Sequence, residues 1–246
     1  MDVQNNPAGR LYDLLDAARQ YPSEEKTKTV WAHVFGVPEN DTGSLLKNLA
    51  DLIDLVHKAK SSIVRLTDVD HKLYLKPFEN IETLLSHLNF ETHWENWRNR
   101  LDDFTLYGLQ FGADRLARSS TFTPIKDEQL EALRKELDDL INHVLESPHL
   151  PPDLKKLFLR NLEALRQAWS TYRIRGIEGL EQEVERSCGS ILLHKEQIRS
   201  AAANSAERKL WEGLLKLVDR LSKLVTLAKN AKGIGAQPLV EHIMGR

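Results

Sequence analysis

The chain contains little that would support covalent cross-links or a membrane span. Its single cysteine, Cys188, excludes an intrachain disulfide and a cysteine-rich zinc site, and it suits a reducing compartment. No apolar run approaches the ~20 residues that cross a bilayer. The polar N-terminus, with Asn5, Asn6 and Pro7, does not resemble a signal peptide. Together these absences predict a cytoplasmic protein.

An excess of charge of either sign is also missing. The 246 residues include 34 Lys and Arg against 36 Asp and Glu, a formal net charge of −2 at pH 7. A DNA-binding protein normally shows a basic excess, so no DNA partner is expected. Hydrophobic residues make up 41% and charged residues 28%, which is typical of a globular protein rather than a disordered chain.

Long stretches of helical periodicity are the main positive feature. Apolar residues recur at steps of three and four, the period of an amphipathic helix, in four stretches. These comprise Leu45, Leu49, Leu52, Val56, Ala59, Ile63 and Leu66; Leu130, Leu133, Leu137, Leu140 and Val144; Leu154, Phe158, Leu162, Leu165, Trp169 and Tyr172; and Leu210, Leu214, Leu217, Leu221, Leu224 and Ala228. Another amphipathic segment lies around residues 177–191, and shorter helices are expected in the first 35 residues and around residues 79–118.

The strand signal is weak by comparison. Lys72 to Phe78 alternates faintly but ends in Lys76-Pro77, and one short strand cannot make a sheet. The stripe of the last helix is wider than the seam of a two-stranded coiled coil and suits a bundle core. We therefore predict an all-α fold, a multi-helix bundle of about seven to nine helices with long amphipathic C-terminal helices.

Two breaks predict how the bundle is organised. The loop-like stretch Ser119 to Pro124 separates an irregular N-terminal helical unit, residues 1–118, from a C-terminal bundle of long helices, residues 125–232. Residues 233–246 form a tail. The corner from Pro148 to Pro152 is expected to set two long helices antiparallel. One continuous domain is the alternative to two units.

The segment from Leu150 to Gly189 carries a resemblance. It contains Leu150-Pro151-Pro152-Asp153-Leu154, Tyr172-Arg173-Ile174-Arg175-Gly176 and Gly179-Leu180. In these residues, which cover about a quarter of the chain, it resembles the C-terminal helical part of uncharacterised bacterial proteins of unknown function. The resemblance implies a bacterial origin and a toxin-like or phage-defence setting, and it transfers no functional residues.

One residue pair matches an enzymatic pattern. Arg65 and His71, in Arg65-Leu66-Thr67-Asp68-Val69-Asp70-His71, resemble the motif of HEPN-type ribonucleases, which are all-α proteins. A guanidinium stabilises phosphate charge, and an imidazole can move a proton near neutral pH. Here the pair lies at the end of a predicted helix, whereas the family's motif normally opens one. A ribonuclease using Arg65 and His71 is therefore kept as an alternative, beside two solvated residues at a helix terminus.

Metal and cofactor motifs are missing. His87 and His93 lie near Glu91 and Glu95, but neither His-Glu-x-x-His nor paired Glu-x-x-His motifs occur. The glycines at Gly233-Ile234-Gly235 lack the lysine and the strand of a phosphate-binding loop. We therefore predict no metal and no cofactor.

Aromatic residues are densest in one segment near the middle of the chain. Trp94, Trp97, Leu101 and Phe104 step by three or four and are expected to share a helix face, and the whole cluster comprises Phe90, Trp94, Trp97, Phe104, Tyr107 and Phe111. Such stripes are usually core. A groove for a partner helix or a small ligand is the alternative.

The last helix concentrates basic residues. Between Glu207 and Lys232 there are seven basic residues against three acidic ones, and Lys209, Lys216 and Lys223 recur every seven residues. A basic amphipathic helix can dock on an acidic partner or lie on an anionic membrane, but its lysines can also simply flank a buried seam. We take Lys209, Lys216, Arg220 and Lys223 as candidate partner-binding residues.

These observations favour a non-enzymatic interaction or regulatory protein. No assembled active site is evident, while the amphipathic surface is extensive. The expected partner is another protein or a second copy of the chain. Two alternatives belong to other classes: the ribonuclease, which predicts an RNA partner, and a membrane-active effector that uses the basic C-terminal helix.

Overall fold

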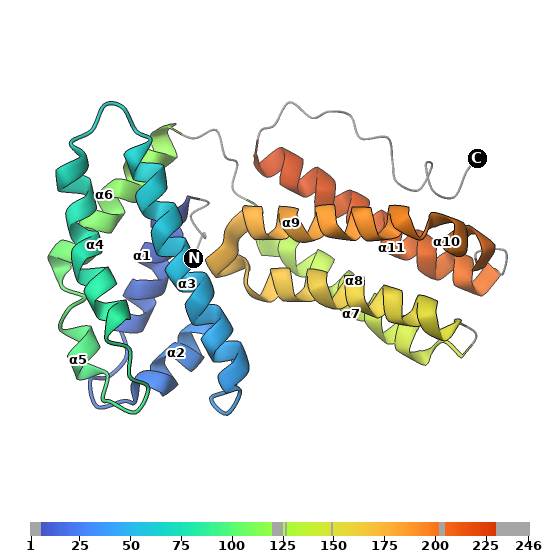
Figure 1. The fold of residues 1–246 in the computed structure, drawn as a ribbon, viewed down its shortest axis with the longest axis horizontal. Coiled ribbons are helices and arrows are strands. Elements are labelled where there is room, and N and C mark those ends of the chain that lie inside the picture. Colours follow the sequence, from blue (N-terminus) through green and yellow to red (C-terminus); the bar gives the residue numbers. More distant parts are fainter. Residues whose placement is uncertain (1–5, 120–124, 126, 149, 202–204, 230–246) are drawn as a thin grey trace. The chain divides into compact units, whose positions relative to one another are not determined.

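The computed structural model describes residues 6–119, 125, 127–148, 150–201 and 205–229 (Figure 1). These residues form helices and no strand, which confirms the all-α prediction. The helices are α1 (Pro7–Arg19), α2 (Thr27–Phe35), α3 (Thr42–Val64), α4 (His71–Ser86), α5 (Glu95–Arg98), α6 (Asp103–Ser119), α7 (Asp127–Glu146), α8 (Pro152–Ser170), α9 (Tyr172–Leu193), α10 (Lys195–Ala201) and α11 (Ser205–Ala228). No helix within the described ranges is long and apolar enough to span a membrane.

The chain divides into two compact units. The first comprises Val3–Thr121 together with Arg173–Gly176, and the second comprises Phe122–Tyr172 and Ile177–Arg246. The sequence pattern had placed residues 173–176 with the C-terminal helices. They join the first unit because the buried side chain of Arg10 in α1 donates a hydrogen bond from Nε to the carbonyl oxygen of Ile174, at 3.3 Å. Gly176, with φ 65°, interrupts the helical geometry of α9 there.

In the first unit, α1 packs on α3 and α6, and α4 packs on α3 and α6. The amide of Asn6 joins two of these helices, because its oxygen accepts from the Gly9 N–H at 2.9 Å while its nitrogen donates to the Ala113 carbonyl at 3.1 Å. The leucine stripe of α3 lies in the core: Leu45, Leu52 and Ile63 are fully buried. The helical period therefore identified the inner face of α3 correctly.

The α4 and α6 helices meet at a glycine. Gly108 in α6 lies against the ring of Pro77 in α4, and a Cβ at position 108 would fall well inside van der Waals distance of Pro77 Cγ. A proline in a helix interior removes a backbone hydrogen bond and is normally costly. Here its ring fills the space that Gly108 leaves open, so the two helices approach closely at this point.

The second unit is built from the long helices. The α7 and α8 helices pack on each other across the Pro148–Pro152 corner, and α11 packs on α7 (Figure 1). The rings of Phe158 and Trp211 lie 3.9 Å apart between centroids, at an angle of 37°. The apolar stripe of α11 is core, since Leu214, Leu217 and Leu221 are at most 1% exposed.

The close approach at Gly108 gives a stability prediction. We expect Gly108→Ala to lower the free energy of unfolding by about 1–3 kcal/mol, because the added methyl group must displace Pro77. Gly112→Ala is the matched control in the same helix, where the added Cβ would lie 3.2 Å from the flexible Cδ1 of Ile63. Both variants gain similar helix propensity, so the difference between them in chemical denaturation reports the α4–α6 contact. Equal stabilities would contradict the packing described here.

Candidate functional site

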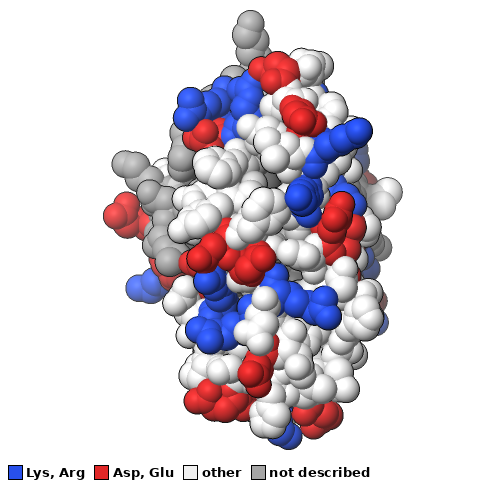
Figure 2. Space-filling view, turned by 90° about the vertical axis from the view of Figure 1, so that its left-hand side faces the viewer, with Lys and Arg blue, Asp and Glu red and all other residues white. Residues whose placement is uncertain are grey.

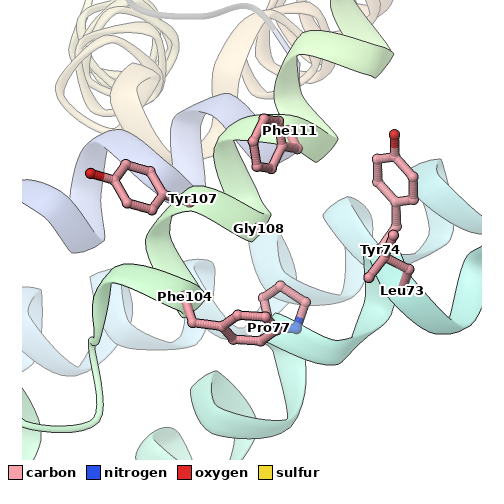
Figure 3. A pocket seen from close by; sticks show the side chains of 7 residues that line it. All are labelled: Leu73, Tyr74, Pro77, Phe104, Tyr107, Gly108 and Phe111. Atoms are coloured by element: carbon pink, nitrogen blue, oxygen red, sulfur yellow. The ribbon is translucent and has the colours of Figure 1, made fainter.

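A groove of about 350 Å³ lies between α4 and α6 in the first unit (Figure 3). We call it the α4–α6 groove. It is lined by Leu73, Tyr74 and Pro77 from α4 and by Phe104, Tyr107, Gly108 and Phe111 from α6. The only polar side-chain atoms among these residues are the two tyrosine hydroxyl oxygens. The groove is therefore an apolar surface built entirely on two helices.

The position of each residue follows from the helical period and the glycine contact. Figure 3 shows Pro77 and Gly108 where the helices approach, with the Phe104 ring beside Pro77. Phe111 stands on the α6 side, and Tyr74 and Leu73 stand across the gap from it. The Pro77 ring occupies the space that a side chain at position 108 would need, and this contact forms the floor of the groove.

The walls of the groove are unusually exposed for side chains of their kind. Relative exposure is 60% for Leu73, 49% for Phe104, 57% for Tyr107 and 67% for Phe111. Isolated exposed apolar residues are ordinary, but a contiguous group of large ones marks a binding surface or an aggregation hazard. Here the four line one groove, which distinguishes them from scattered exposures such as Leu227 in α11.

The sequence of α6 explains why these side chains remain outside. One face of the helix, with Leu106, Leu109 and Ala113, is buried in the first unit. Phe104, Tyr107 and Phe111 repeat at steps of three and four on a second face. Both faces are apolar, but the unit covers only the inner one.

Charged side chains surround the groove unevenly. On α4, the ammonium group of Lys76 lies 5.4 Å from the centroid of the Phe104 ring, a cation–π arrangement. On α6, Asp103 pairs with Arg19 at 2.6 Å and Asp114 pairs with Arg118 at 2.8 Å. Figure 2 views the molecule from this side and shows uncharged residues over much of the face, with small groups of both charges among them. The face thus carries no field of one sign that would suit nucleic acid.

The aromatic cluster of the sequence separates into two parts. Trp94 and Trp97 are buried with Trp31, whose ring lies edge-on to Trp94 at 5.8 Å. Phe104 does not share a helix face with them, because α5 ends at Arg98 and a separate helix begins at Asp103. The expectation of core is therefore right for the tryptophans, whereas Phe104 and the aromatic residues that follow it line a groove.

Arg65 and His71 lie on either side of the loop between α3 and α4. Arg65 is the exposed residue that follows α3, and His71 is the first residue of α4. His71 Nε2 lies 2.7 Å from the carbonyl oxygen of Leu66. Because a carbonyl only accepts, this nitrogen carries its proton, and Nδ1 is the nitrogen left to act as a base. Within residues 6–119 no hydrogen bond joins Arg65 to His71, and the ribonuclease hypothesis stays a prediction.

The basic residues of α11 lie beside acidic neighbours. Arg220 pairs with Glu136 of α7 at 2.5 Å, Lys223 pairs with Asp219 at 2.8 Å, and Lys216 lies 4.0 Å from Glu212. Lys209 is exposed and has no ion pair within the described part of the chain. The partner-binding role of these four residues stays a prediction. The ion pairs lower the positive charge that this helix offers to an acidic partner or to a membrane.

The candidate metal-binding residues are engaged locally. His87 Nδ1 lies 2.8 Å from the Thr83 carbonyl, and His93 Nδ1 lies 2.8 Å from the Glu24 carbonyl. In the described ranges no three His, Cys, Asp or Glu side chains gather as metal ligands would. Burial raises the pKa of the Cys188 thiol, which makes it a poor nucleophile at neutral pH.

No protein family model, no curated protein and no solved structure was found to match the chain.

The α4 half of the groove was missed in the sequence. The sequence pattern gave no strand over Lys72 to Phe78 and placed the next helix only from about residue 79, whereas these residues lie in the first half of α4, which begins at His71. Leu73 and Pro77 are four residues apart, and Tyr74 lies beside them on a helical projection. That spacing was a usable signal, but a proline in the segment argues against a helix interior.

One carboxyl group of the first unit gives a pH-dependent prediction. Asp51 in α3 has a buried Oδ2 with no hydrogen-bond partner among the described residues. Desolvation raises its pKa above 3.8, against the opposing attraction of Arg175 and Lys47. The protonated form is thus favoured in the folded state, and stability is lost as the pH rises through the folded pKa.

We therefore expect Asp51→Asn to raise the melting temperature at pH 7. The gain should shrink as the pH falls through the folded pKa of Asp51 and vanish below its unfolded value of about 3.8. Glu79→Gln, an exposed substitution in α4 of the same unit, is the control and should change the melting temperature little at any pH. A gain for Asp51→Asn that is independent of pH would show that burial of the charge is not its cause.

Proposed function

We propose that the chain is a non-enzymatic interaction protein, and that its α4–α6 groove binds an apolar segment of another protein. The observation that carries the proposal is the group of four large apolar side chains exposed around Pro77 and Gly108. Interface cores are enriched in such aromatic residues and depleted in charge. Full burial of one of these side chains contributes about 1.5–3 kcal/mol relative to leaving it exposed.

The rigidity of the site supports the same proposal. Every lining residue lies on α4 or α6, and these helices are held together beneath the groove by the contact of Pro77 with Gly108. A surface that is already ordered loses little conformational entropy when a partner binds. The proposal places this interaction in a bacterial cell, in keeping with the resemblance of residues 150–189, and extends to a regulatory role in a toxin-like or phage-defence setting.

The alternative uses of the molecule have less support. A membrane-active role for α11 requires that helix to leave the core, since Trp211, Leu214 and Leu217 are fully buried. The ribonuclease role requires Arg65 and His71 to flank one phosphate, and His71 is bound to the Leu66 carbonyl. Neither alternative uses the exposed groove.

The proposal is tested by removing one wall of the groove. We expect Phe111→Ser to leave the free energy of unfolding within about 0.5–1 kcal/mol of the original, since surface substitutions generally do. Proteins retained from an extract of the source cells should fall at least tenfold with this variant, as measured by quantitative mass spectrometry. Leu227→Ser, at a position with 70% exposure against 67% for Phe111, is the matched control and should retain them.

Two results decide the test. Retention of the same proteins by the original chain, Phe111→Ser and Leu227→Ser alike would refute the groove as the binding surface. Light scattering on the same three proteins covers the other partner that the sequence suggests. A dimer lost only in Phe111→Ser would identify the partner as a second copy of the chain.

A further inference from the structure

We infer that the occupant of the α4–α6 groove is an amphipathic helix of a partner protein, with acidic residues along the flank that faces α4. This inference rests on the proposed function and adds the conformation and charge of the partner. It draws on the shape of the groove, on the backbone of its walls, and on the charges along its two edges.

The dimensions of the groove match a short stretch of helix. Phe104 and Phe111 are seven residues apart on α6, which separates them by about 10 Å along the helix axis. Apolar residues at positions i, i+4 and i+7 of a partner helix cover a similar length. About two turns of such a helix can therefore lie between the α6 wall and the α4 wall.

The walls of the groove cannot bind a peptide as an added β-strand, which is one common mode of peptide recognition. An extended peptide that adds to a sheet edge needs a row of unpaired backbone N–H and C=O groups. The groove residues of α4 and α6 lie inside helices, whose backbone groups bond within the helix except at the Leu73 carbonyl, which has no N–H partner at Pro77. The groove offers side-chain surface and no strand edge, and a helix, which satisfies its own backbone, suits such a surface.

The charges along the α4 edge predict the charge of the partner helix on the flank that faces α4. Lys72 and Lys76 are exposed on α4 one turn apart, along the flank next to Leu73. Neither lysine has an ion pair in the described part of the chain, and Glu79 lies one turn beyond Lys76 on this flank. Two lysines against one glutamate give this flank of α4 a net positive charge, while the exposed Asp70 carboxylate caps the N-terminal end of the helix and accepts a hydrogen bond from the Lys72 N–H.

The opposite edge lacks such an excess. Its carboxylates, Asp103 and Asp114, are paired with Arg19 and Arg118. A partner helix whose acidic residues face α4 therefore gains attraction on that edge without a matching repulsion from α6. The lysines of α4 therefore favour a partner helix that carries acidic residues beside its apolar stripe, on the flank that faces α4.

The experiment is a selection from a displayed library of helix-forming peptides about four turns long, with the charged positions randomised. It is run on the original chain, on Phe111→Ser and on the double variant Lys72→Glu, Lys76→Glu. The original chain should enrich peptides with apolar residues at i, i+4 and i+7 and with Asp or Glu on one flank. The double variant should enrich Lys or Arg on that flank, and Phe111→Ser should enrich nothing.

The other outcomes of the selection contradict either the proposed function or the inference about the partner helix. If the original chain enriches no more than Phe111→Ser does, the proposed function fails together with the inference. If apolar helical peptides are enriched with no charge preference, or with a basic one, the inference alone fails. Enrichment of proline-rich or non-periodic peptides removes the helix, and self-association that Phe111→Ser abolishes assigns the groove to a second copy.

A selected peptide then allows a quantitative check by fluorescence anisotropy. Lys76→Glu should weaken its binding about three- to tenfold, because an exposed ion pair is replaced by a like-charge contact. Lys58→Glu is the matched control, an equivalent charge reversal at an exposed position of α3 outside the groove, and should leave the affinity unchanged. Equal affinities for all three proteins would remove Lys76 from the interaction. Circular dichroism melts of each variant confirm that the fold is intact.

Discussion

The contact between Gly108 and Pro77 is the constraint on which the rest of the α4–α6 region depends. Gly108 in α6 and Pro77 in α4 are each unfavourable inside a helix, since the glycine costs backbone entropy and the proline removes a hydrogen bond. Together they let two helices approach more closely than side chains would allow. The close approach leaves an unfilled space above it, and the walls of that space are apolar. The contact of Gly108 with Pro77 thus both joins the two helices and forms the groove between them.

The aromatic wall of α6 is left largely uncovered by the fold, although Phe104 makes a cation–π contact with Lys76. Its inner face already packs in the core, and the outer residues Phe104, Tyr107 and Phe111 are about half exposed or more. Leaving apolar surface in water forgoes the free energy of burial, a loss that a binding partner recovers. The helices that carry this wall are ordered before binding, so most of the recovered free energy is available for affinity. The aromatic side chains that the fold leaves exposed in the groove are therefore available to bind a partner.

The sequence predicted the parts of the molecule in which one periodic signal dominates. The stripes of α3 and α11 gave both the helices and their buried faces, because a leucine every three or four residues has one structural solution. Phe104 was predicted to share a helix face with Trp94 and Trp97 because the helical spacing of apolar residues continues across the break at Asn99–Asp102. Periodicity alone does not show where one helix ends and the next begins. Leu73 and Pro77 were overlooked because the environment that tolerates a proline inside α4 lies thirty-one residues away, at Gly108. Contacts of that kind are tertiary, and no local pattern reports them.

The most direct test of the account places a photo-reactive phenylalanine derivative at position 111 in the living source cell and maps the cross-linked peptide by mass spectrometry. The same derivative at the exposed position 227 of α11 serves as the reference. We expect a cross-link specific to position 111, to a partner segment with helical apolar periodicity and acidic residues on one flank. Cross-links shared with position 227, or a position-111 cross-link that maps only to this chain or to lipid, would contradict it.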